Sequence, residues 1–227
     1  MNRIKLAIFD LDGTLIDSLE DLTDATNFML SGMGKENMNG EQVKKLVGQG
    51  ARRLVERAIP GVSTDELERA LGYFISYNDE HIVDKTRLYP DVKGTLMSLR
   101  DSGCRLAVIS NKNSALCRKV INALGVEDFF EVVMGADTMP FRKPSPEPVL
   151  KLLRDFGVNT ENAVIVGDSI NDVAAGKAAG ILTVGCTYGY GELSEVEGAD
   201  YVVGAFVEIL DLPIFAEAGE HKTGRRY

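Results

Sequence analysis

The stretch Ile4-Lys5-Leu6-Ala7-Ile8-Phe9-Asp10-Leu11-Asp12-Gly13-Thr14-Leu15 decides the fold. Its first half is mostly apolar, which is typical of a strand buried between two layers of helices. Asp10 and Asp12 follow at the carboxyl end of this strand, where open α/β sheets bind ligands. Because residues i and i+2 of an extended chain face the same side, both carboxylates are expected to point into one space. Such a pair needs a proton or a cation between its members, and oxygen ligands favour Mg²⁺.

This stretch has two other interpretations. An acidic strand-to-turn junction is the plain alternative, because Asp-Gly is ordinary turn chemistry. A calcium-binding loop does not fit, since Thr14 occupies the third acidic position, Gly13 comes too early and no Glu stands at the twelfth place. The residues therefore favour the magnesium interpretation.

Composition limits the class of partner. The chain has 227 residues and a net charge of -9, from 25 basic and 34 acidic residues. This balance argues against nucleic acid and against an anionic membrane surface as general partners. Any anionic substrate must therefore meet a local cluster of basic side chains. The sequence leaves the oligomeric state open between a monomer and a small homo-oligomer.

Cysteine usage and hydropathy point to the cytoplasm. Cys104, Cys117 and Cys186 are odd in number and far apart, so we expect reduced thiols. The first apolar run stops at Asp10 with no cleavage site after it, which argues against a signal peptide. No apolar run approaches the length that crosses a membrane.

A helical pattern follows the opening strand for about seventy residues. Ser18 with Asp21, and Ser63 with Glu66, predict capping boxes at two helix starts. Gly48-Gln49-Gly50 and Pro60-Gly61 interrupt the pattern. The sequence therefore predicts an inserted, all-helical cap of about four helices over residues 16–84.

Strands and helices alternate over the rest of the chain. Buried strands are predicted at 105–109, 132–134, 163–166, 181–184 and 201–203, with helices between them. Repeated strand-helix units imply a parallel, Rossmann-like sheet with right-handed crossovers and helices on both faces. We predict an α/β catalytic core over residues 1–15 and 85–215, and a loose C-terminal tail over 216–227.

Polar side chains recur where the predicted strands end. Ser110-Asn111 and Asp168 each follow a strand, while Lys143 and Asp172 lie close to predicted helix starts. Taken singly, each has a plain alternative as a turn, a helix cap or a solvated lysine. Taken together, they put acids, a hydroxyl and a lysine on one sheet edge. That set suits phosphoryl transfer, which needs acids for Mg²⁺ and donors for anionic oxygens.

These residues resemble the four motifs of the haloacid dehalogenase superfamily. The matching segments are Asp10-Leu11-Asp12-Gly13-Thr14-Leu15, Ser110-Asn111, Lys143-Pro144 and Gly167-Asp168-Ser169-Ile170-Asn171-Asp172. Their order and spacing agree with the family over about residues 4–210. Asp12 places the chain with the phosphatase branch, because enzymes that cleave carbon–halogen bonds lack this second Asp. The helical insert is similar in location to the family's cap domain.

The resemblance implies a role for each motif residue. Asp10 is the nucleophile that forms an aspartyl-phosphate, and Asp12 is the general acid and then the general base. Mg²⁺ is held by Asp10, the backbone carbonyl of Asp12 and Asp168, while Asp172 orients that shell. Ser110 and Lys143 hold the phosphoryl group.

The cap suggests the substrate. Leu46-Val47-Gly48-Gln49-Gly50-Ala51 is similar to the cap loop of bacterial phosphoglycolate phosphatases, although the usual loop has Asn in place of Gln49. Arg52 and Arg53 belong to a basic cluster beside this loop. We therefore expect Asn111, Gly48, Gln49, Gly50, Arg52 and Arg53 to bind substrate, with 2-phosphoglycolate as the expected phosphomonoester. The plain alternative is that the arginines are solvated.

Other functions remain possible from the sequence. A sugar-phosphate mutase of the β-phosphoglucomutase type and a pyrophosphatase share much of the motif pattern. A phospho-accepting receiver module also uses acids, a hydroxyl and a lysine. A receiver is shorter, needs no helical insert and lacks a second Asp two residues after the phosphorylated one. A silent scaffold is disfavoured because no motif residue is missing.

Overall fold

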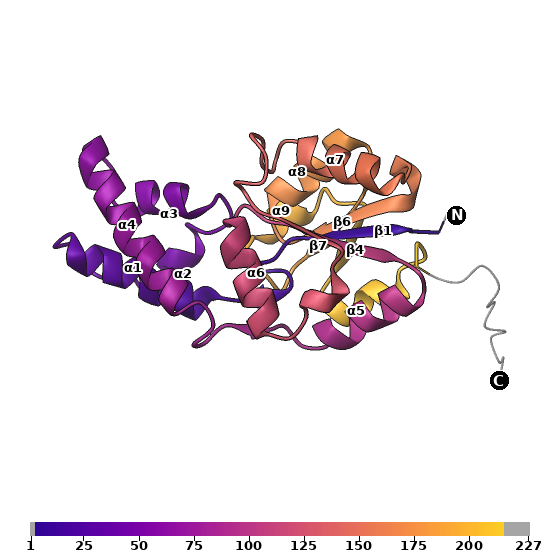
Figure 1. The fold of residues 1–227 in the computed structure, drawn as a ribbon, viewed down its shortest axis with the longest axis horizontal. Helices are drawn as coiled ribbons and strands as arrows, with labels where there is room; N and C mark the ends of the chain where they lie inside the picture. Colours follow the sequence, from indigo (N-terminus) through magenta and orange to yellow (C-terminus); the bar gives the residue numbers. More distant parts are fainter. Residues whose placement is uncertain (1–2, 216–227) are drawn as a thin grey trace.

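The computed structural model describes residues 3–215, and its centre is a six-stranded sheet in the order β5-β4-β1-β6-β7-β8. All neighbouring strands in this sheet run parallel. The strands are β1 (Leu6–Phe9), β4 (Arg105–Ile109), β5 (Val132–Met134), β6 (Ala163–Gly167), β7 (Leu182–Cys186) and β8 (Tyr201–Val203). The carboxyl ends of β1, β4 and β6 therefore meet at one edge (Figure 1).

Helices cover both faces of the sheet, which confirms the predicted fold class (Figure 1). Phe9 and Val108 face a cluster with α5, α6 and η3, whereas Ile8 and Ala107 face a cluster with α7 and α8. The helices are α5 (Val92–Asp101), α6 (Ser114–Ala123), α7 (Glu147–Phe156), α8 (Ile170–Ala179), α9 (Leu193–Val196), and the 3-10 helices η1 (Glu127–Phe129), η2 (Thr160–Asn162) and η3 (Phe206–Asp211). Because helices bury these strands on both faces, the sequences of the strands are continuously apolar.

The inserted helices lie together beyond the carboxyl edge of the sheet (Figure 1). They are α1 (Leu19–Gly32), α2 (Gly40–Lys44), α3 (Ala51–Ala58) and α4 (Thr64–Glu80). Met29, Val55 and Phe74 belong to an apolar cluster formed by the residues of this insert alone. The division of the chain at residues 16 and 84 stays a prediction, and this separate cluster is consistent with it. We call these helices and their loops the cap.

The two connections between cap and core run side by side. β2 (Ile16–Asp17) leaves the core and pairs antiparallel with β3 (Arg87–Leu88), which returns to it. The backbone amide of Tyr89 also donates to the carbonyl of Leu15 at 3.1 Å. The cap therefore hinges on one short ribbon that starts directly after the Asp10–Gly13 loop.

One predicted capping box is confirmed and the other is wrong. Ser63 and Glu66 bond reciprocally at the start of α4. Ser18 makes no capping bond at α1, because its hydroxyl donates to Asp12 at 2.5 Å. Asp21 instead accepts hydrogen bonds from the backbone amides of Lys85 and Thr86, at 3.0 and 2.8 Å. Both side chains thus tie the start of the cap to the core, and local sequence pattern does not report such contacts.

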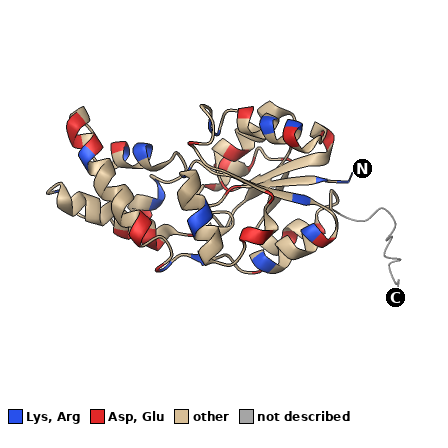
Figure 2. Cartoon of the chain, in the orientation of Figure 1, with Lys and Arg blue, Asp and Glu red and all other residues tan. Residues whose placement is uncertain are grey.

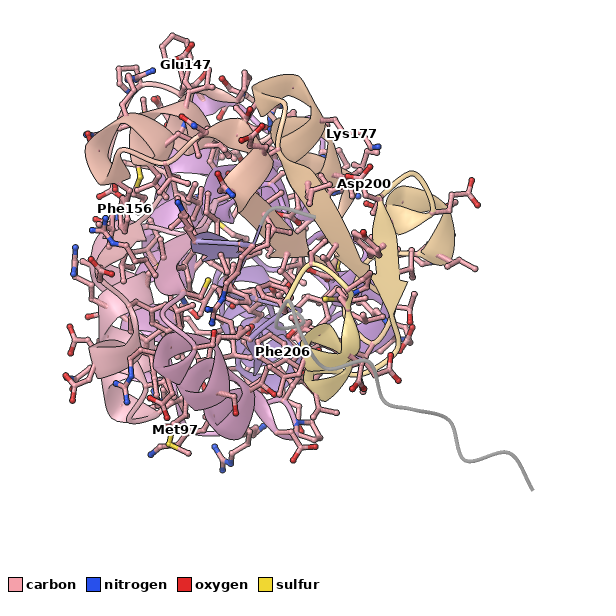
Figure 3. The ribbon with its side chains drawn as sticks, turned by 90° about the vertical axis from the view of Figure 1, so that its right-hand side faces the viewer. Met97, Glu147, Phe156, Lys177, Asp200 and Phe206 are labelled. Atoms are coloured by element: carbon pink, nitrogen blue, oxygen red, sulfur yellow. The ribbon has the colours of Figure 1, made fainter. Side chains whose placement is uncertain are left out.

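Charges of both signs are interspersed over the core and the cap (Figure 2). Figure 3 views the core from the end opposite the cap, where Phe206 lies inside and Lys177 lies near Asp200 at the periphery, with 3.5 Å between the charged atoms. Among residues 3–215, no helix combines the length and apolarity needed to cross a membrane. The predicted tail at 216–227 falls outside the described residues.

Candidate active site

Three buried carboxylates converge at the carboxyl edge of the sheet. Asp10 follows β1, Asp168 follows β6, and Asp172 lies in the first turn of α8. One oxygen of each lies within 4.8 Å of the others, and the residues are 8%, 3% and 1% exposed. Burial raises the pKa of Asp10 to about 8 and that of Asp168 to about 6. These buried carboxyl groups are costly to ionise without a cation nearby. A small, hard divalent cation such as Mg²⁺ would offset the charge of their oxygens.

Lys143 supplies one positive charge to this group. Its Nζ lies 2.9 Å from Asp10 and 2.6 Å from Asp172, and the residue is only 2% exposed. Burial by itself lowers the pKa of Lys143, but the two carboxylates outweigh that effect and leave the pKa raised. The side chain is therefore a fixed ammonium beside the carboxylate of Asp10. One cation against three acids leaves the negative charge uncompensated, which again fits a bound divalent ion.

Asp168 is held in place by neighbouring loops. Its carboxylate accepts hydrogen bonds from Thr14 Oγ1 at 3.0 Å and from the backbone amides of Tyr190 and Gly191 at 2.7 and 3.3 Å. Gly13 has φ +85°, and a Cβ there would lie 2.2 Å from an Asp168 oxygen. The close approach of these two loops therefore requires glycine at position 13. Thr14 and Tyr190 were not predicted as site residues.

The Asp12 carboxylate has different neighbours from those expected. It lies 2.9 and 3.2 Å from Lys112 Nζ, and its Oδ1 accepts the 2.5 Å hydrogen bond from Ser18. It is not part of the close carboxylate group of Asp10, Asp168 and Asp172. The cation beside the Asp12 side chain in this structure is therefore Lys112. The predicted metal contact through the backbone carbonyl of Asp12 stays a prediction.

Ser110 and Asn111 directly follow β4 at the same edge, and both are buried. Asn111 Nδ2 donates to the carbonyl of Lys143 and to the carbonyl of Gly48, each at 3.0 Å. Asn111 therefore joins the lysine loop of the core to the glycine loop of the cap. Lys112, the residue after this pair, was missed in the sequence analysis. The available signal was a lysine that directly follows two polar residues at a strand end.

Two cavities open at this edge of the sheet, and Asp10, Asp12 and Gly48 line both. The first measures about 480 Å³ and lies between α4 of the cap and the start of α6. Ser110 and Asn111 also line it. The second measures about 600 Å³ and is lined by Gln49 together with Asp168. The Gly48-Gln49-Gly50 loop therefore lies over the aspartates, as expected of residues that contact substrate.

The predicted arginines do not reach either cavity. Arg52 pairs with Glu68 at 2.8 Å and Arg53 pairs with Glu56 at 2.7 Å, with the arginine side chains 48% and 57% exposed. Neither residue is among those that line the two cavities. Three other basic residues line the second cavity, namely Lys44, Lys45 and Arg57. The structure thus brings together the motif residues and the glycine loop, but not Arg52 or Arg53.

Comparisons with known proteins agree with this geometry. Residues 7–186 match the family model described as haloacid dehalogenase-like hydrolase. A protein of Chromobacterium violaceum named phosphoglycolate phosphatase is 38% identical over 217 residues, which cover 93% of this chain and 97% of the relative. A Neisseria meningitidis protein of the same name is 35% identical over 93% of this chain and 94% of its own.

A solved structure shows the same arrangement. The crystal structure of a predicted phosphoglycolate phosphatase from Haemophilus somnus superposes with a TM-score of 0.89 at 33% identity, covering 93% of this chain and 98% of the other. The family match spans Asp10, Ser110 and Asp168, which follow strands of the sheet, and Lys143 in the loop before α7. The chain therefore belongs to the haloacid dehalogenase-like hydrolase family, and it is an enzyme similar to those named phosphoglycolate phosphatase.

Proposed function

We propose that this enzyme is a Mg²⁺-dependent phosphatase that hydrolyses a small phosphomonoester, 2-phosphoglycolate, through an aspartyl-phosphate on Asp10. The observation that carries the proposal is the buried group of Asp10, Asp168 and Asp172 around Lys143, with the Asp12 carboxylate beside it. The names of the relatives support the choice of substrate. A carboxylate can attack a phosphate dianion only where positive charge offsets both.

The chain's own residues suit a bound Mg²⁺. Asp10, the backbone carbonyl of Asp12 and Asp168 would hold the ion, and Asp172 would orient its surroundings. The ion would offset the charge on the phosphoryl oxygens. Lys143 stays an ammonium between Asp10 and Asp172 and offers donors to the same oxygens. The Ser110 hydroxyl lines the first cavity and provides a further donor.

In the first half-reaction, a carboxylate oxygen of Asp10 attacks the phosphorus atom. The bond between phosphorus and the ester oxygen breaks, and that oxygen takes the proton from the Asp12 carboxyl group. The products are the aspartyl-phosphate and the free alcohol, which is glycolate for 2-phosphoglycolate. Ser18 and Lys112 hold the Asp12 side chain in position for this transfer.

In the second half-reaction, a water molecule attacks the phosphorus atom of the aspartyl-phosphate. The Asp12 carboxylate accepts a proton from this water, the acyl phosphate bond breaks, and Asp10 is released as a carboxylate. Inorganic phosphate leaves, and Asp12 holds the proton for the next cycle. The same residue therefore serves as acid and then as base.

The cap would exclude bulk water and sort substrates. Gly48, Gln49 and Gly50 lie over the aspartates and are proposed to contact the leaving group. The expected contacts of Arg52 and Arg53 with substrate stay a prediction from the sequence, and in this structure each arginine is paired with a glutamate.

The test is a phosphate-release screen with Mg²⁺ over 2-phosphoglycolate, sugar phosphates, pyrophosphate and an aryl phosphate. The proposal expects the highest kcat/KM with 2-phosphoglycolate, and no release in excess chelator. Isomerisation of a hexose phosphate without net release of phosphate would favour the mutase instead. A stable phosphoprotein that releases no phosphate would favour the receiver.

A further inference from the structure

We propose that Lys112 of the core, rather than an arginine of the cap, binds the carboxylate of the leaving group. This inference rests on the proposed function and names the residue that would select an anionic phosphoester. The second of the four motif segments consists of Ser110-Asn111 and stops before Lys112, so none of the assignments above gives Lys112 a role toward substrate. Its role in the proposal comes from its position beside Asp12 and in the first cavity.

The position of Lys112 is unusual for a lysine. The side chain is 9% exposed, and its Nζ contacts both oxygens of Asp12, at 2.9 and 3.2 Å. The residue lines the first cavity together with Asp10 and Asp12. Among the described residues that line this cavity, Lys112 is the only lysine or arginine. An anion that enters this space therefore meets one ammonium group, in surroundings where charge interactions are poorly screened.

The chemistry of Asp12 places the leaving group next to Lys112. To donate its proton, the Asp12 carboxyl group must touch the ester oxygen of the substrate. In 2-phosphoglycolate the carboxylate is one carbon away from that oxygen. An ammonium in direct contact with Asp12 is therefore within reach of the substrate carboxylate.

A second lysine lies near the same aspartates, but it is less suited to bind the leaving group. Lys143 cannot take this part, because it is enclosed between Asp10 and Asp172 and is only 2% exposed.

The other basic residues near the site are less suited. Lys44, Lys45 and Arg57 line the second cavity, on the other side of the Gly48 loop. That cavity is also lined by Glu41, Glu192 and Glu195, which oppose an incoming carboxylate. Outside the motifs, the first cavity is lined by one acid among residues 3–215, Asp79, whose charge is offset by Lys119 at 2.9 Å. Arg52 and Arg53 lie outside both cavities and are paired with glutamates.

The experiment compares two substrates that differ in one group. The first is 2-phosphoglycolate, and the second is 2-hydroxyethyl phosphate, in which a neutral CH₂OH group replaces the carboxylate. Lys112→Met keeps most of the side-chain length and removes the charge. We expect the ratio of the two kcat/KM values to fall by roughly ten- to a hundredfold, the effect of losing one charge-assisted hydrogen bond.

Binding without turnover gives an independent readout. Glycolate, as a product that carries the carboxylate, should inhibit the wild-type enzyme. Its inhibition constant should rise by a similar factor in Lys112→Met and return toward the wild-type value in Lys112→Arg. If Lys112→Met does not fold by circular dichroism, Lys112→Gln serves as a second neutral variant.

Matched controls separate the possible results. Lys44→Met and Lys45→Met remove a charge from the second cavity and should leave the substrate ratio unchanged. An equal loss on both substrates in Lys112→Met would show that Lys112 only holds Asp12, and the proposal would be wrong. If the ratio of the two kcat/KM values falls only in Lys44→Met or Lys45→Met, the second cavity binds the carboxylate and the proposal is wrong. A wild-type enzyme that hydrolyses neither ester would instead refute the proposed function.

Discussion

The backbone carbonyl of Gly48, in the cap, lies 3.0 Å from the side-chain nitrogen of Asn111, in the core. The same carbonyl lies 3.3 Å from Asn171 Nδ2, at the start of α8. Two residues later, a Cβ at Gly50 would lie 2.7 Å from the backbone oxygen of Asn111. The Gly48-Gln49-Gly50 loop is therefore docked on two core loops, close to Asp10 and Asp12. Glycine has no side chain, and this allows the backbone of the loop to approach the core closely.

The first prediction tests this docking. Gly50→Ala should lower kcat/KM for the preferred phosphoester by about tenfold or more, because a misplaced closing loop misaligns the substrate. Gly61→Ala is the matched control, since Gly61 has a similar φ of +80° against +83° but open space around its Cβ. Both variants should lose about 1 kcal/mol of stability from backbone strain. Similar kinetics for the two variants would mean that the Asn111 contact does not matter for catalysis.

The second prediction concerns the two aspartates of the first motif. Asp10→Asn should abolish turnover, because an amide cannot act as the nucleophile. Asp12→Asn should slow the reaction by roughly 10² or more through loss of acid-base catalysis. Steady-state phosphate release measures both effects, and circular dichroism checks the fold. Wild-type rates in Asp10→Asn would exclude it as the nucleophile.

The third prediction concerns metal and pH. The pKa values of Asp10 and Asp168 are raised to about 8 and about 6, so the folded state holds these protons more tightly than the unfolded chain. In chelator, stability should therefore fall as pH rises from the unfolded carboxyl values of about 4 toward 8. Mg²⁺ should restore it, by about 2.7 kcal/mol at a hundredfold excess over Kd.

Differential scanning fluorimetry measures this effect. The Mg²⁺-induced rise in Tm should be larger at pH 8.5 than at pH 5.5, because protonated carboxyl groups bind the ion poorly. Asp168→Asn should lose most of the rise, whereas Asp155→Asn, on the exposed face of α7, should keep it. A rise that is the same in Asp168→Asn would place the ion elsewhere.

The fourth prediction concerns the cysteines. Cys104, Cys117 and Cys186 are free and buried. Burial raises the pKa of Cys104 and of Cys117 to about 12, and it also raises that of Cys186. The native protein should therefore react slowly with a thiol reagent such as Ellman's reagent at pH 8, because the thiolate is the reacting form. All three cysteines should react in guanidinium chloride, and rapid labelling of the native protein would contradict the burial of these side chains.

The sequence by itself determined the α/β architecture and the edge at which the motif residues meet. Apolar runs such as the one at 163–166 are typical of strands buried on both faces, and the parallel order of these strands places Asp10, Ser110 and Asp168 together. The start of α4 could also be predicted from the sequence, because the Ser63–Glu66 capping box depends on two residues three positions apart.

Only the tertiary structure decided which groups the charged side chains contact. Lys112 pairs with Asp12 across a hundred positions of sequence, and Asp21 binds the backbone at Lys85 instead of capping its own helix. Arg52 turns to Glu68 of the cap and away from the site. Secondary-structure propensity and hydrophobic periodicity depend on residues that are close together in the sequence. The partner of a long, charged side chain is instead set by whichever opposite charge folding brings within reach.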